Sequence, residues 1–174
     1  MILKSLREKS NQKYINKQLI SRRSSISDQK IETLAVILNS AEFVDFEVFR
    51  ELARELKVHP NKIKIIAYTE DHKEVAVSRE MLFSAKEIGW RAKIKSPELN
   101  DFLNKDFDAL LCFYNEEKVE LNLVTAMSKA NFKIGISGQD ERLFDFIIKT
   151  KSNDFGVFKN ELIKYLNILN KLKK

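Results

Sequence analysis

The stretch FDALLCFYNEEKVELNLVTAMSKANFKIGISG, residues 107–138, decides the fold. It opens with the apolar run FDALLCFYN, continues with helical periodicity over residues 116–131, and closes with a second apolar run, FKIGISG. A strand, a helix and a second strand within about 30 residues are typical of a βαβ unit. Parallel strands joined by a crossover helix need a sheet that is covered on both faces. The stretch therefore predicts an α/β protein.

The segments before this stretch repeat the alternation of strand and helix. Residues 33–39, TLAVILN, and 62–69, KIKIIAYT, are apolar runs typical of buried strands. Between them, apolar side chains recur at three- and four-residue spacing over residues 43–56, which predicts a helix. Ser40 is a candidate N-cap for this helix, and His59-Pro60 ends it because a residue before proline avoids the α region.

The remaining segments are less regular. The pattern predicts a turn over 70–73, a short edge strand over 75–77, a short helix over 78–88 and a weak strand over 91–94. Ser96-Pro97 is a helix start, with Ser96 as N-cap. A strand over 143–150 and a periodic helix over 157–172 close the chain. Together these elements predict a single Rossmann-like, doubly wound α/β sandwich with a mostly parallel sheet in the order 3-2-1-4-5-6.

Composition limits the classes of site. Cys112 is the single cysteine, so it forms no intramolecular disulfide, and neither His59 nor His72 has a neighbour at ligand spacing. No GxGxxG or GxxxxGK[ST] motif occurs, and we therefore predict no metal and no cofactor. No run of 18 apolar residues and no secretory signal is visible, which favours a cytoplasmic location.

The net charge of +6 is concentrated at the N-terminus. Residues 1–32 carry eight basic and three acidic side chains, a net charge of +5, and the other 142 residues carry +1. We predict a basic, helical arm over residues 1–31 and an α/β sandwich domain over residues 32–174. The candidates for contact with a polyanion such as RNA are Lys4, Arg7, Lys9, Lys13, Lys17, Arg22 and Arg23.

The apolar residues of this arm scatter around a helical wheel. Ile2 and Leu6 lie on one side, and Ile15 and Leu19 lie on another, which disfavours a membrane-surface helix. A solvated tail and a helix docked on its own domain are the alternatives to a polyanion contact.

Polar residues follow several of the predicted strands. In an open α/β sheet a ligand belongs at the carboxyl ends of the strands, near the point where the strand order reverses. The candidate ligand-binding residues there are Asn39, Ser40, Thr69, Asn115, Ser137, Gly138 and Arg142, with Glu70 and Glu116 beside them. Loop and cap chemistry explains the same residues, since Asn115 precedes the predicted 116–131 helix as an N-cap does.

Several segments of the domain together carry a specific resemblance: FVDFEVFRELARELKV, YTEDHKEV, LFSAKEIGW, residues 107–148 and the terminal ELIKYLNILNKL. With these segments, the chain from about residue 32 to the end resembles an uncharacterised family of proteins of unknown function from Bacteroidetes. This resemblance implies a bacterial, cytoplasmic protein.

Two further stretches, LAVILNSAEFVDFEVF and FDALLCFYN with FKIGIS, carry a second and more distant resemblance. They are similar to the first strand, loop and helix, and to a later unit, of the N-terminal, acceptor-side domain of heptosyltransferase-type glycosyltransferases. The resemblance places Asp45 at the position of their candidate base and so adds it to the candidate residues. Val44 stands where that pattern has glycine, and the 174 residues hold no counterpart of the donor-binding domain.

Three functional hypotheses follow. The first is a non-enzymatic binding or adaptor domain whose basic arm contacts a protein partner. The second is an enzyme, or a degenerate half of a glycosyltransferase, that binds a small polar ligand in the crevice. The third is an accessory factor that contacts RNA or a ribonucleoprotein through residues 1–31.

Overall fold

The computed structural model describes residues 1–23, 27–71 and 80–174. Within these residues six strands form one parallel sheet in the order β3-β2-β1-β4-β5-β6. The predicted fold class and the predicted strand order are confirmed. The strands are β1 (Leu34–Asn39), β2 (Ile63–Tyr68), β3 (Met81–Phe83), β4 (Ala109–Phe113), β5 (Phe132–Ile136) and β6 (Phe146–Ile148).

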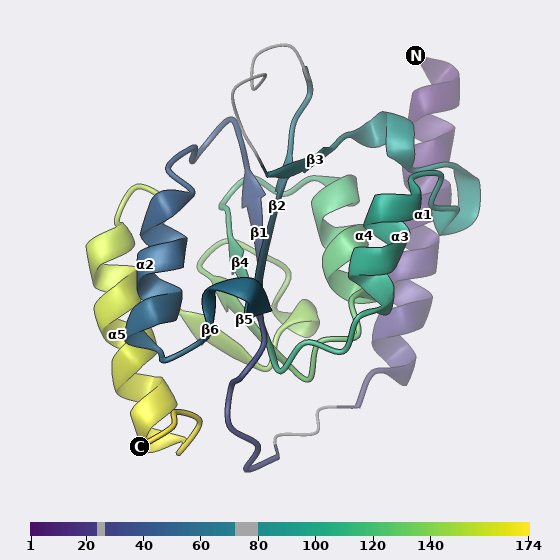
Figure 1. Ribbon diagram of the computed structural model, residues 1–174. Helices are drawn as coiled ribbons and strands as arrows, with labels where there is room; N and C mark the ends of the chain where they lie inside the picture. Colours follow the sequence, from purple (N-terminus) through teal and green to yellow (C-terminus); the bar gives the residue numbers. More distant parts are fainter. Residues whose placement is uncertain (24–26, 72–79) are drawn as a thin grey trace.

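Helices cover both faces of the sheet (Figure 1). On one face lie α2 (Glu47–Glu55) and α5 (Phe155–Ile168), and on the other lie α3 (Pro97–Asn104) and α4 (Val119–Met127). The N-terminal helix α1 (Ile2–Ser21) packs against α4, so that side of the sheet carries an additional helix. Each face of the sheet has its own hydrophobic core.

The central strands are buried along their whole length. Every residue of β1, β4 and β5 is buried, as continuous apolar runs predict for a sheet covered on both faces. Leu111 of β4 pairs in register with Ile134 of β5, and α4 connects these two strands. The βαβ unit predicted from residues 107–138 is therefore confirmed.

The irregular segment differs from its prediction. Residues 78–88 do not form a helix where the structure describes them, because Met81–Phe83 is β3 and Ala85–Glu87 is a 3-10 turn, η2. The predicted strand over 91–94 is also wrong: Trp90–Ala92 forms the 3-10 turn η3, in which Arg91 and Ala92 have φ values of 51° and 59°. Left-handed conformations interrupt a strand. The edge strand predicted over 75–77 lies outside the described residues, as does part of the turn predicted over 70–73.

Two predicted caps are wrong and one is confirmed. Ser40 does not cap α2, which begins only after Phe46, and Asn115 does not cap α4, which begins after Lys118. Both loops are longer than predicted, and their polar groups form hydrogen bonds at the strand ends instead. Ser96 does cap α3, because its hydroxyl accepts a hydrogen bond from the N–H of Leu99 at 3.2 Å.

The C-terminal elements have shifted bounds. The strand predicted over 143–150 shortens to β6, since Glu141–Leu143 forms the 3-10 turn η4. Helix α5 begins at Phe155 instead of Val157, because the Asp154 carboxylate accepts a hydrogen bond from the N–H of Val157 at 3.1 Å and caps the helix.

Helix α1 is fixed to the rest of the molecule. Its residues Asn11 and Ile15 are buried, and the side-chain oxygen of Asn11 accepts a hydrogen bond from the N–H of Ala92 at 2.8 Å. After the last turn, the Arg22 guanidinium donates to the Asp145 carboxylate at 2.6 Å. The helix is therefore held near its middle and just beyond its end.

Lys133 is a buried charge in β5. Its ammonium donates to the carbonyl oxygen of Thr125 in α4 at 2.7 Å, and the residue is only 5% exposed. Burial, helped by the nearby positive charge of Arg22, lowers the pKa of Lys133 to about 8.

Replacing Leu111 with alanine should lower the free energy of unfolding by about 2–5 kcal/mol, because the change leaves a cavity between two packed layers. Urea denaturation followed by circular dichroism measures this loss. Ile168→Ala, at an exposed position of α5, is the matched control and should change stability little. A loss below about 1 kcal/mol for Leu111→Ala would contradict a fully packed β4.

Replacing Lys133 with methionine should alter how stability depends on pH. A lysine with a lowered pKa in the folded state binds its proton more strongly in the unfolded chain, so its contribution to stability rises from about pH 8 to about pH 10.5. Relative to Lys133→Met, the wild type should therefore gain stability over this range. Denaturant unfolding at several pH values tests this, and a constant difference between the two proteins would show that Lys133 keeps its ordinary pKa.

Candidate functional site

The carboxyl ends of the parallel strands meet at one edge of the sheet. Asn39 ends β1, Thr69 follows β2, Asn115 lies two residues after the end of β4, and Ser137 follows β5. The structure therefore places these four predicted residues along the same edge, on either side of the β1–β4 pair where the strand order reverses.

Glu42 joins the two loops at this reversal point. Its carboxylate accepts hydrogen bonds from the backbone N–H groups of Asn115 at 2.6 Å and Glu116 at 2.5 Å. The side-chain amide of Asn39 also donates to it at 3.4 Å. One carboxylate from the β1–α2 loop thus fastens the β4–α4 loop across the position where a ligand binds in open α/β sheets.

Asn115 extends this network to the next strands. Its amide nitrogen donates to the carbonyl oxygen of Ser137 at 2.8 Å, and its amide oxygen accepts from the N–H of Ser152 at 2.6 Å. The side chain therefore connects the loops after β4, β5 and β6 and is occupied on both of its polar atoms.

Gln139 fills the space behind the same loops. Its amide oxygen accepts from the N–H of Ile136 at 2.9 Å, and its amide nitrogen donates to the carbonyl oxygen of Tyr114 at 2.7 Å. A Cβ atom at Gly135 would collide with Gln139 and with Phe144, so the glycine in FKIGISG allows this close approach. Gly138 has a φ of 90°, a turn conformation that favours glycine.

The other crevice candidates do not converge on a ligand site. The hydroxyl of Thr69 donates to the carbonyl oxygen of Asp71 at 3.0 Å, and the N–H of Ser40 donates to the carbonyl oxygen of Tyr68 at 2.9 Å. Asp45 is exposed in the loop before α2. Arg142 instead binds the Asp140 carboxylate through two nitrogens and donates to the side chain of Asn16 in α1 at 3.1 Å.

Lys118 organises the outer rim of the crevice. Its ammonium lies 2.8 Å from the Glu70 carboxylate and 2.9 Å from that of Glu116, and 5.8 Å from the centre of the Tyr68 ring. Burial opposes the charge of Lys118, but the two carboxylates outweigh it and raise the pKa. Burial, together with the charge of Glu120, raises the pKa of Tyr68 to about 12. Neither group is suited to proton transfer near neutral pH.

Cys112 is also unsuited to chemistry. It lies fully buried in β4, and its sulfur is 3.4 Å from the hydroxyl oxygen of Thr125. Burial raises the pKa of this thiol to about 12, so the nucleophilic thiolate is scarce.

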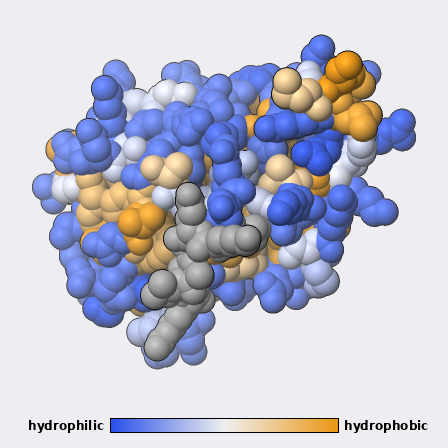
Figure 2. Space-filling view, turned by 90° about the horizontal axis from the view of Figure 1, so that it is seen from above, coloured by the Kyte–Doolittle hydropathy of each residue, from blue (hydrophilic) through white to orange (hydrophobic). Residues whose placement is uncertain are grey.

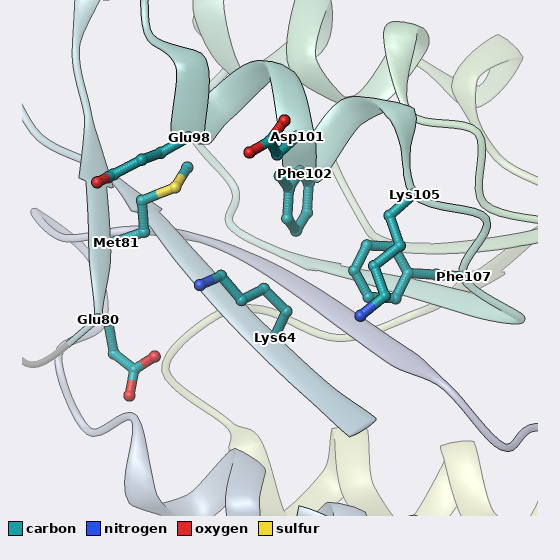
Figure 3. Close-up of a pocket in the computed structure, with 8 residues that line it drawn as sticks. All are labelled: Lys64, Glu80, Met81, Glu98, Asp101, Phe102, Lys105 and Phe107. Carbon is teal, nitrogen blue, oxygen red and sulfur yellow. The ribbon is translucent and has the colours of Figure 1, made fainter. Parts of the chain in front are cut away.

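Two pockets lie near the sheet, and the sequence analysis predicted only two of the residues that line them. One of about 380 Å³ is lined by Ile147 of β6 and by residues beyond the ends of β5 and β6, including the predicted Ser137 and Gly138. Another of about 520 Å³ lies between β2, β3 and α3 (Figure 3). In Figure 3 the rings of Phe102 and Phe107 line it beside two lysines and three acidic residues, a mixture that favours no single ligand class.

The outer surface of α1 carries a row of lysines. Lys9, Lys13 and Lys17 recur every four residues, and they line a groove of about 520 Å³ with Leu6, Tyr14 and Arg91. The N–H of Arg91 donates to the hydroxyl of Ser10 at 3.3 Å, which holds η3 beside the helix. We call Lys9, Lys13, Lys17 and Arg91 the basic row. Arg91 is a member that sequence reasoning missed, because only its turn conformation brings it to α1.

The other predicted polyanion contacts lie elsewhere. Lys4 is 3.9 Å from the Glu8 carboxylate, and Arg7 is half-buried. Arg22 is paired with Asp145, and both Arg22 and Arg23 line a separate polar pocket of about 280 Å³ with Lys129.

The described residues contain neither a metal-binding cluster nor a membrane-spanning helix. Across residues 1–23, 27–71 and 80–174, His, Cys, Asp and Glu side chains form no cluster that could hold a metal ion. In the same residues no helix has the length and hydrophobicity needed to cross a membrane.

Replacing Glu42 with alanine should destabilise the protein by about 1–3 kcal/mol, because two backbone N–H groups at the strand ends lose their acceptor. Glu51→Ala, an exposed acidic residue of α2, is the matched control. Glu42→Gln should recover part of the loss, since one acceptor oxygen remains. Thermal and urea unfolding measure these differences, and a loss within about 0.5 kcal/mol of the control would argue against a fastening role.

Comparison with known proteins identifies the family of this chain but assigns no function. No curated protein matches the chain. The model of a family of unknown function matches residues 7–169, from within α1 to just past the end of α5. Of the two sequence resemblances, the one to a family of unknown function is thus confirmed at that level. The chain belongs to the family of unknown function DUF6913.

Proposed function

We propose that this protein is a non-enzymatic binding domain that presents α1 to an anionic partner. In this proposal residues 1–31 are the contact arm, and residues 32–174 are the domain that holds it in place. The partner is an RNA, a protein assembly or another surface that offers phosphate or carboxylate groups. The buried, unpaired Cys112 is consistent with the reducing cytoplasm as the location.

The basic row is the observation that carries this proposal. Its three lysines make no ion pair with any residue that the structure describes, so their charges face solvent unneutralised. Because α1 is fixed through Asn11 and Ile15, the lysines keep a constant spacing of about 6 Å along the helix. A fixed row of charges loses less conformational entropy on binding than a free tail does.

The strand ends support this proposal over an enzyme. The polar side-chain groups of Glu42, Asn115 and Gln139 form hydrogen bonds with the loops around them. Two titratable groups nearby, Tyr68 and Lys118, keep their protons near neutral pH. An enzyme or a degenerate glycosyltransferase half remains the second candidate, and exposed Asp45 is the residue on which it depends.

Replacing Lys9, Lys13 and Lys17 together with glutamine should weaken binding to a polyanion on the order of 100-fold at low salt, since each contact contributes about 1 kcal/mol. The probes are fluorescent poly(U) RNA and vesicles that contain phosphatidylserine. Lys149, Lys151 and Lys174, all exposed and outside α1, are changed to glutamine as the control with the same net charge.

The control triple variant should bind like the wild type. If the RNA is the partner, three phosphate contacts predict a slope of log affinity against log salt of about −2. The proposal is refuted if the wild type binds neither probe at low salt, or if both triple variants lose binding equally.

A further inference from the structure

Apolar side chains are unusually exposed on α1. Among the described residues nine large apolar side chains are exposed, and four of them lie on this helix. They are Ile2 at 78%, Leu3 at 71%, Leu6 at 45% and Ile20 at 87%. Figure 2 shows apolar residues gathered at the end of the molecule where α1 begins. A helix that only covered its own domain would expose polar residues on its outer side.

The exposed isoleucines share one face with the lysines. Ile2 lies seven residues before Lys9, and Lys13 lies seven residues before Ile20. Seven residues are about two helical turns, so each isoleucine lies on the same side of the helix as its lysine. Ile2 and Ile20 are eighteen residues apart, or about five turns, so both project on the same side. Buried Asn11 and Ile15 occupy the opposite side. The scattered helical wheel therefore resolves into an inner face that is packed and an outer face that combines isoleucine with lysine.

We infer that this outer face binds an anionic lipid surface, an inference that rests on the proposed function and names its partner. An interfacial helix places apolar side chains at the boundary of the acyl chains and keeps lysine ammonium groups among the headgroups. The length of α1, about 30 Å for 20 residues, lets Ile2 and Ile20 reach the lipid at both ends of the helix.

Other occupants use only part of this face. RNA phosphates would pair with the lysines and leave the isoleucines in water. A second copy of the chain in a symmetric α1–α1 contact would bring two basic rows together, and like charges repel. A phosphatidylserine surface complements both the charge and the apolar side chains.

Vesicle flotation with the full chain tests the inference. Wild-type protein should partition onto vesicles of phosphatidylcholine mixed with enough phosphatidylserine to give a surface potential of about −30 mV, and hardly onto phosphatidylcholine alone. Replacing Ile2, Leu6 and Ile20 together with serine should lower the partition coefficient on the order of 100-fold, about a factor of five for each side chain at partial insertion. The matched control replaces Val44, Val157 and Ile168, three exposed apolar residues outside α1, with serine.

The apolar variant also separates this inference from the proposed function. Loss of vesicle binding in the α1 serine variant, with normal binding in the control variant, supports a lipid surface. Lysine-dependent binding to vesicles or poly(U) that the serine changes leave intact overturns the lipid inference and keeps the proposed function. Absence of lysine-dependent binding to both probes overturns both. A concentration-dependent dimer in analytical ultracentrifugation that only the α1 serine changes abolish would assign this face to a second copy instead.

Discussion

One carboxylate holds the strand ends of this protein together. At the reversal of strand order, the loops after β1 and β4 lead to helices on opposite faces of the sheet, and in many α/β proteins a ligand occupies the gap. Here Glu42 crosses the gap and accepts the N–H groups that a ligand's anionic group would otherwise take. Asn115 and Gln139 then fasten the neighbouring loops. The polar residues of the crevice therefore stabilise the fold, which favours the proposed recognition on another surface.

The composition of α4 explains why α1 is docked on the domain. Residues 120–125 of α4 are all buried, so the helix has no solvent-facing side and needs cover away from the sheet. Helix α1 supplies it and buries Ile15 in the same core as Leu121 and Leu123. Once α1 is docked, its charge and its exposed apolar side chains are fixed outward. The match of the family model from residue 7 onwards includes most of this helix, which agrees with a role in the fold.

The sequence predicted the elements whose burial dominates their conformation. The apolar runs of β1, β4 and β5 predicted strands buried on both faces. The strand order was predicted from the right-handed crossovers of doubly wound sheets. Prediction failed where local hydrogen bonds decide the structure. Ser84 and Glu87 close a single turn in place of a helix, and the left-handed φ of Arg91 ends the strand expected there. Glu42 was missed because its acceptor role joins residues 73 positions apart, which no local pattern records.

The same limit applies to α1, where sequence and structure lead to opposite inferences from one helical wheel. Taken alone, the apolar residues of α1 have no common direction, so the wheel disfavours a membrane surface. Once Ile15 is packed in the core of the domain, the exposed Ile2, Leu6 and Ile20 share the direction of Lys9 and Lys13. Packing thus removes one subset from the wheel and leaves a second, amphipathic subset exposed. For any docked helix, the residues that pack against the protein's own core have to be left out of the helical wheel before its outer face is interpreted.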